Sequence, residues 1–173
     1  MLHLKNSFFI ILLGSLVFVS CEYLLPQYIE FDTESFNREW AAWEAQGLVN
    51  YSVDEEFSRY GRAGNVRIAV QNNVIIEKKA LDEWTSPKWD FDGVITISEI
   101  YVWVNSQYER ALERIKKRES RGITIEFTYN KEFHYPEYVS ISGAGYNPIG
   151  SLSDVDPDYI RLSEFIPASI PEE

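Results

Sequence analysis

Cysteine and histidine are scarce in this chain of 173 residues, which has one cysteine and two histidines. One thiol cannot form an intramolecular disulfide, and a zinc site built from Cys and His needs more ligands than these. Basic side chains are also in deficit, since 16 Lys and Arg stand against 27 Asp and Glu, for a net charge of −11. This balance disfavours nucleic-acid binding and electrostatic docking on anionic lipid. We expect no cofactor and no nucleic-acid partner.

Motifs of catalysis are equally absent from the sequence. No Gly-x-Ser-x-Gly elbow and no Gly-Lys-Ser or Gly-Lys-Thr phosphate loop occurs. The stretch Gly143-Ala144-Gly145 lacks the third glycine and the following helix of a dinucleotide loop. His134 is the only histidine after residue 3, and we interpret it as a turn residue rather than as the base of a triad.

Alternating carboxylates in residues 153–158 form the best metal candidate in the chain. Asp154, Asp156 and Asp158 have the spacing that opens a calcium-binding loop. The sixth position counted from Asp154 is Tyr159 instead of glycine, however, and the twelfth is Phe165 instead of glutamate. We therefore interpret the segment as an acidic turn before the last strand, and these three residues as weak metal candidates only.

Long hydrophobic runs are also missing, and the longest, Phe8 to Ser20, is too short for a permanent span, which needs about 20 residues. Its length is typical of the apolar core of a signal peptide. It ends in Phe18-Val19-Ser20-Cys21, which resembles a bacterial lipobox, where the cysteine is acylated and becomes the first mature residue. An uncleaved anchor or an ordinary signal peptide with an accidental cysteine are the alternatives.

The lipobox predicts the organisation of the whole chain. We expect a signal peptide over residues 1–20, a lipid-anchored tether over 21–32 that starts at the palmitate-bearing Cys21, and one domain over 33–173. The protein would then lie in the bacterial cell envelope, held on a membrane by its acyl chains.

Hydrophobic periodicity predicts an N-terminal helix followed by three strands. The helix spans Thr33 to Gln46, with Asp32 or Thr33 as N-cap, Gly47 after its end, and a core-facing aromatic stripe. Alternating apolar residues then predict strands near residues 51–57 and 66–70, and Val74-Ile75-Ile76 continues after a tight turn at Asn72-Asn73.

A longer helix and further strands follow. Thr96-Ile97-Ser98-Glu99 is a capping box that begins the helix, and Gly122 is expected to end it. The basic residues near its end, Arg114, Lys116, Lys117, Arg118 and Arg121, complement the helix dipole, and we interpret them as a solvated helix end. Strands are expected at 123–129, 138–142 and 160–162. This order predicts an α+β fold, an antiparallel sheet with the N-terminal helix and the long central helix packed on one face.

The segment 81–93 (LDEWTSPKWDFDG) is irregular and aromatic. Trp84, Trp89 and Phe91 stand among four carboxylates. Such aromatics stack on sugar rings or cations, so these three residues are the candidate ligand-binding residues. The alternative is that they cover one end of the core.

Several stretches together resemble one family of exported bacterial proteins. They are residues 96–101 (TISEIY), residues 125–130 (IEFTYN), Tyr135-Pro136 and residues 158–165 (DYIRLSEF). In this order they resemble the family called domain of unknown function 6174, over residues 34–165. Many members carry a cysteine pair after the first strand, where this chain reads FSRYG at 57–61. The resemblance implies the fold and export, without a reaction and without any role of that pair.

Two classes of function remain. The first is a lipid-anchored binding module, whose sheet edge or aromatic loop engages an envelope protein or a glycan. The second is a carboxylate-dependent hydrolase of envelope polymers, which would require two acidic groups that converge in a cleft, one with a raised pKa. A purely structural lipoprotein is a third alternative.

Overall fold

A computed structural model describes residues 28–59, 62–83, 85, 93–117, 122–143 and 158–168. Seven strands form one sheet in the order β1-β5-β6-β7-β2-β3-β4. The elements along the chain are β1 (Tyr28–Glu30), α2 (Thr33–Gln46), β2 (Tyr51–Arg59), β3 (Arg62–Gln71), β4 (Val74–Ala80), α3 (Ile97–Lys116), β5 (Gly122–Tyr129), β6 (Pro136–Ser142) and β7 (Asp158–Pro167). All strand pairs are antiparallel except β1 with β5. The predicted α+β class with an antiparallel sheet is confirmed, apart from the one parallel pair.

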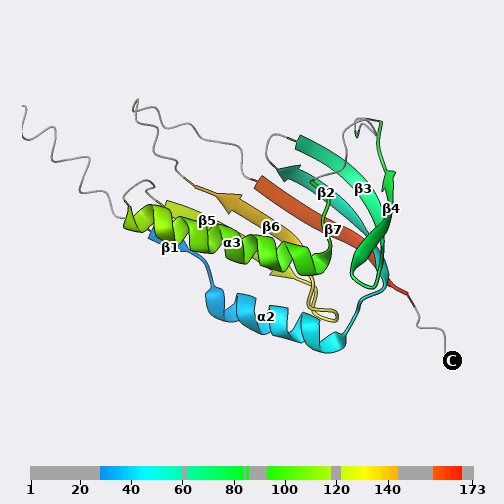
Figure 1. The fold of residues 1–173 in the computed structure, drawn as a ribbon, viewed down its shortest axis with the longest axis horizontal. Coiled ribbons are helices and arrows are strands. Elements are labelled where there is room, and N and C mark those ends of the chain that lie inside the picture. Colours follow the sequence, from blue (N-terminus) through cyan, green and yellow to red (C-terminus); the bar gives the residue numbers. More distant parts are fainter. Residues whose placement is uncertain are drawn as a thin grey trace, which may run out of the picture.

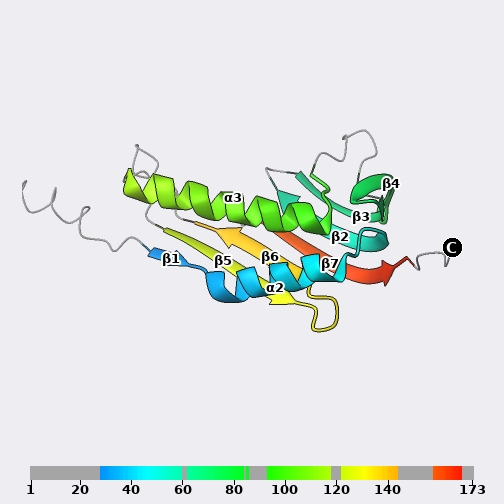
Figure 2. The same ribbon diagram turned by 60° about the horizontal axis from the view of Figure 1, so that its bottom comes forward.

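Both helices lie on one face of the sheet, where α3 crosses the strands and α2 runs beside it (Figures 1 and 2). Phe36 of α2 contacts Tyr101 of α3 and Phe127 of β5, with ring centroids 5.6 and 5.3 Å apart. Trp40 stacks on Tyr101 at 5.7 Å, and Trp43 contacts Tyr51 of β2 at 5.8 Å. The aromatic stripe of α2 therefore packs in the core between the helices and the sheet.

Local capping signals set where the two helices begin. The Asp32 side chain accepts a hydrogen bond from the Ser35 backbone N–H at 3.0 Å, and Gly47 ends α2 in the left-handed conformation, at φ 63°. At the start of α3, the Thr96 side chain accepts from the Glu99 N–H and the Glu99 carboxylate accepts from the Thr96 N–H. The predicted capping box is confirmed.

The end of α3 differs from the expectation. The helix ends at Lys116, and Gly122 is the first residue of β5, so the prediction that Gly122 ends the helix was wrong. Glycine is needed at position 122 because a neighbouring strand approaches closely there. A Cβ atom there would lie 2.5 Å from Cε1 of Tyr28, because β1 runs directly beside β5.

All six predicted strands extend beyond their predicted ranges, and a seventh strand was not predicted. Residues 28–30, in the segment expected to be a tether, form β1 at one edge of the sheet and pair in parallel with β5. The last strand, expected only at residues 160–162, is β7 and lies between β6 and β2. The turn at Asn72-Asn73 is as predicted, since both residues are left-handed, at φ 52° and 60°.

The topology has a twofold repetition that the sequence does not reveal. Helix α2 is followed by the strands β2, β3 and β4, and helix α3 by β5, β6 and β7, each set pairing in chain order. The two sets join where β7 pairs with β2, so the sheet is continuous across both units.

Candidate functional site

The segment with the three candidate aromatics, residues 84–92, is called the aromatic loop below. Trp84, Trp89 and Phe91 lie outside the described residues, but Thr85 near the start of the loop and the chain on both sides of it are described. On the first side, Leu81 donates its N–H to the Asn65 carbonyl at 2.9 Å. Thr85 is buried, with 5% of its surface exposed, and its Oγ1 accepts from the Asn65 N–H at 2.8 Å. The first side of the loop is therefore held on β3.

The second side of the loop is held by two side chains of β2. Arg59 Nη1 donates to the Gly93 carbonyl at 3.1 Å. Glu55 Oε2 accepts from the Ile95 N–H at 3.4 Å, two residues further along. Both residues are buried, and both act on the short stretch that leads from the loop into α3.

The Phe57 ring joins the two sides. A Cβ atom at Gly93 would lie 2.8 Å from Phe57 Cε2, so only glycine fits against the ring there. At Gly64, a Cβ atom would meet Phe57 Cε1 at 3.1 Å and Thr85 Cγ2 at 3.2 Å. Residues from both sides of the loop therefore pack around one buried ring at the end of the β2–β3 pair.

The two charged residues of β2 that bind this stretch, Glu55 and Arg59, are unusual for a core. Glu55 is 0% exposed, and burial raises its pKa to about 8, although the Arg59 charge opposes that shift. The Glu55 carboxyl is therefore mainly protonated at pH 7. Its Oε1 has no hydrogen-bond partner among the described residues. The Arg59 guanidinium lies over the Trp103 ring, 4.4 Å from its centroid, which is a cation–π contact.

The sequence analysis did not identify Glu55 and Arg59 as site residues. A usable signal was present, because the side chains of a strand alternate between its two faces. In β2, Tyr51, Val53 and Phe57 point to the core, and Glu55 and Arg59 share their parity. Two charged residues on the apolar face of a strand indicate a buried polar site.

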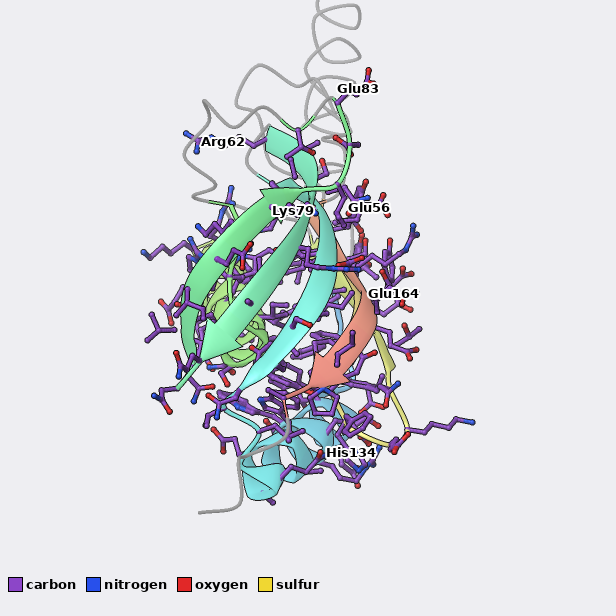
Figure 3. All side chains as sticks on the ribbon, turned by 90° about the vertical axis from the view of Figure 1, so that its right-hand side faces the viewer. Glu56, Arg62, Lys79, Glu83, His134 and Glu164 are labelled. Atoms are coloured by element: carbon purple, nitrogen blue, oxygen red, sulfur yellow. The ribbon has the colours of Figure 1, made fainter. Side chains whose placement is uncertain are left out.

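The next carboxylate along β2, that of Glu56, lies on the opposite face of the sheet. Its Oε2 accepts from Arg161 at 3.0 Å and its Oε1 from the Tyr159 hydroxyl at 3.1 Å. Figure 3 shows Glu56 and Glu164 pointing out from the same side of the sheet. The adjacent acids Glu55 and Glu56 therefore do not converge, as expected for successive residues of a strand. Burial is the main cause of the raised pKa of Glu55, and Glu99, whose charge also raises it, is engaged in capping α3.

The sheet edge at β4, opposite the β1 edge, is the alternative binding surface considered next, since the sequence analysis named an edge of the sheet. In the described part of the chain, β4 is the last strand on that side and exposes Val74 and Ile76. It also presents Lys78 and Lys79, and the β3–β4 pairing has an irregularity after Ala69. Lysines and bulges are features that protect edge strands from pairing with other chains. The aromatic loop is therefore the better candidate.

His134 lies at the opposite end of the domain from Glu83, the described residue just before the loop (Figure 3). It is in the turn between β5 and β6, as predicted, with a left-handed backbone at φ 57°. Its Nδ1 lies 2.7 Å from Glu39 Oε2, and its carbonyl accepts from the Tyr101 hydroxyl. The hydrogen bond with His134 lowers the pKa of Glu39. These contacts hold the turn against α2 and α3.

The metal and anchor predictions fall mainly on undescribed residues. Asp154, Asp156 and Cys21 lie outside the described ranges, and Asp158 begins β7 opposite Ile141. Within those ranges, no three His, Cys, Asp or Glu side chains are grouped to hold a metal ion. Neither described helix is both long and apolar enough to cross a membrane.

Comparisons with known proteins leave the family open, since no protein family, curated protein or solved structure matches this chain.

Proposed function

We propose that this protein is a lipid-anchored binding module of the bacterial cell envelope, and that its aromatic loop engages an envelope protein or a glycan. The observation that supports the proposal most is the way the loop is held. The side chains of Arg59, Glu55 and Phe57 in β2 hold its second end, and the backbone of Asn65 in β3 holds its first end through the Thr85 side chain.

Holding a loop at both ends favours binding because less conformational entropy is lost when a ligand is bound. The arrangement also has a cost for stability, since a carboxyl with a raised pKa and a guanidinium are both taken out of water. Ordinary core packing would use apolar residues at these two positions. Features that cost stability in this way are typical of functional sites.

The hydrolase alternative meets only half of its requirement. Glu55 has the raised pKa of a general acid, but its surface is 0% exposed, so it offers no contact to a polymeric substrate. Its neighbour Glu56 faces the other way, and Glu99 is engaged in a cap. A single enclosed carboxyl supports a structural role below the loop better than general acid–base catalysis.

The same proposal includes acylation of Cys21 and a relationship to the family domain of unknown function 6174. The lipobox at Cys21 supports the lipid anchor. The N-terminal peptide of the purified protein should begin at Cys21 and carry the added mass of acyl chains. Cys21→Ser should leave an unprocessed precursor. An unmodified cysteine in a mature chain would contradict the anchor.

The binding proposal is tested by crosslinking in intact cells and identifying the captured species by mass spectrometry. Deletion of the whole loop is too coarse, because Thr85 is a buried part of its base. The double variant Trp89→Ala/Phe91→Ala removes two candidate aromatics beyond Thr85. We expect it to lose the dominant captured species and to keep the thermal unfolding transition of the wild type.

The matched control removes two aromatic rings from the far face of the sheet. Tyr138 and Tyr159 contact each other there, with centroids 6.4 Å apart. Tyr138→Ala/Tyr159→Ala should retain capture. If the loop variant folds and still captures the same species, the loop is not the binding surface. If only the tyrosine variant loses capture, the binding surface is the outer sheet face instead of the loop.

A further inference from the structure

The position of β1 determines which end of the domain faces the membrane, once the lipid anchor of the proposed function is accepted. Cys21 and Tyr28 are seven residues apart, so they can be separated by at most about 25 Å, however the intervening chain runs. Tyr28 pairs with Gly122, the first residue of β5. This end of the sheet therefore stays close to the lipid headgroups.

The C-terminal end of α3 lies at the same end of the domain (Figures 1 and 2). Lys117, which caps the helix, is five residues from Gly122 and hence within about 18 Å of it. The end of the longest helix, the start of β1 and the start of β5 thus form one surface, which we call the anchored end.

Charge is distributed very unevenly between the anchored end and the rest of the chain. The last eight residues up to the cap, Arg110 to Lys117, contain four basic residues and one acidic residue. Since the whole chain has a net charge of −11, the remainder has −14. Arg114, Lys116 and Lys117 are all exposed. The Lys116–Glu113 ion pair at 3.0 Å is exposed on both sides, and such pairs are weak enough to exchange partners.

Tyr28 adds an aromatic side chain to this surface. Its ring lies against Gly122, yet 47% of the residue is exposed. Tyrosine is enriched where protein meets the headgroup region, because its ring is apolar and its hydroxyl is polar. Basic side chains at the same end of the domain as an exposed tyrosine, a few residues from the proposed acyl chain, have the composition of a lipid-facing surface.

We propose that the anchored end docks on anionic phospholipid headgroups through the basic residues Arg114, Lys116 and Lys117. The acidic remainder is repelled by the same membrane, so attraction and repulsion together orient the domain. The net charge of the chain opposes docking on anionic lipid, as its composition predicts, whereas the local charge favours docking of this one end.

The test uses the full lipidated protein on two kinds of vesicle, one of phosphatidylcholine alone and one that also contains phosphatidylglycerol. Exposed lysines are acetylated, and the modification rate of each is measured by mass spectrometry. We expect Lys116 and Lys117 to react at least about threefold more slowly on the anionic vesicles, because a basic residue gains free energy near an anionic surface. High salt should remove the difference. Lys79 and Lys131, which are exposed elsewhere, should be unaffected.

Two variants with equal charge changes provide the control. Arg114→Glu/Lys117→Glu should abolish the protection of Lys116, whereas Lys79→Glu/Lys131→Glu should preserve it. The proposal would be overturned if Lys116 and Lys117 were acetylated at equal rates on both kinds of vesicle. It would also be overturned if Lys116 stayed protected after the charges at positions 114 and 117 were reversed. Failure of the anchor is a separate result, since an unacylated chain would not float with vesicles of phosphatidylcholine alone.

Discussion

Replacing Glu55 by glutamine should change how stability depends on pH. Glu55 is buried against the stretch that leads from the aromatic loop into α3, and burial raises its pKa from 4.5 to about 8. Between these values the folded protein binds more protons than the unfolded chain, so the free energy of unfolding falls as pH rises. The stabilisation is complete below the unfolded value and is lost as pH approaches 8.

The size of the effect follows from the shift in pKa. Each pH unit in this window reduces the free energy of unfolding by about 1.4 kcal/mol. From pH 5 to pH 7.5, Glu55 alone therefore lowers the stability of the wild type by about 3 kcal/mol. Glutamine does not ionise, so Glu55→Gln should remove this slope. Its amide places two donors in a site where Oε1 has no described partner, which costs about 1–3 kcal/mol at every pH.

The assay is urea unfolding of the wild type and the variant at a series of pH values. The difference in their free energies of unfolding should shift by about 3 kcal/mol in favour of the variant from pH 5 to pH 7.5. Glu56→Gln is the matched control, because it changes the next residue of the same strand on the solvent side, where Arg161 pairs with it. A constant difference for Glu55→Gln, or an equal shift for Glu56→Gln, would refute the reasoning.

Three further predictions concern the frame of the fold. Gly122→Ala places a Cβ against the Tyr28 ring, so it should lower the free energy of unfolding in urea by about 1–3 kcal/mol. In a Tyr28→Ala background the same substitution should have little effect. An equal loss of stability in both backgrounds would exclude this contact as the cause. Glu39→Gln should lower stability at neutral pH by about 1 kcal/mol, because the carboxylate is bonded to His134. Since the pKa of Glu39 is lowered, that contribution is present above about pH 4.5 and is lost on acidification, so wild type and variant should converge in acid; a constant gap would contradict it. Asn73→Ala should cost about 1 kcal/mol and Asn73→Gly should not, since the residue is left-handed at φ 60°; equal thermal midpoints for the two would contradict this.

Much of the fold could be predicted because its signals are local. The range of α2, the capping box at Thr96 and the turn at Asn72-Asn73 each depend on residues close in sequence. The three residues of β1 could not be predicted, since they are too few to show a period and they pair with a strand about 90 positions away. The role of Gly122 depends on that same pairing, so the error at the end of α3 has the same cause.

The candidate site could be predicted only in part. The aromatic loop is conspicuous in composition, and its three aromatic residues were identified from that alone. The residues that hold it, Glu55 and Arg59, resemble ordinary charged residues of an acidic chain until β2 is placed with one face in the core. Their role needs the tertiary structure, because the backbone groups they bind are 40 positions away for Glu55 and 34 for Arg59.

Site-specific photo-crosslinking in intact cells tests the central claim, that the aromatic loop binds an envelope partner, most directly. A photoreactive residue replaces Glu83, which is exposed just before the loop, and in a second strain it replaces Lys131, beside His134 at the opposite end. The proposed function predicts one dominant adduct from position 83 and none from position 131, lost when Trp89 and Phe91 are changed to alanine. The same adducts from both positions, or an adduct from position 83 that persists without the two aromatics, would contradict it.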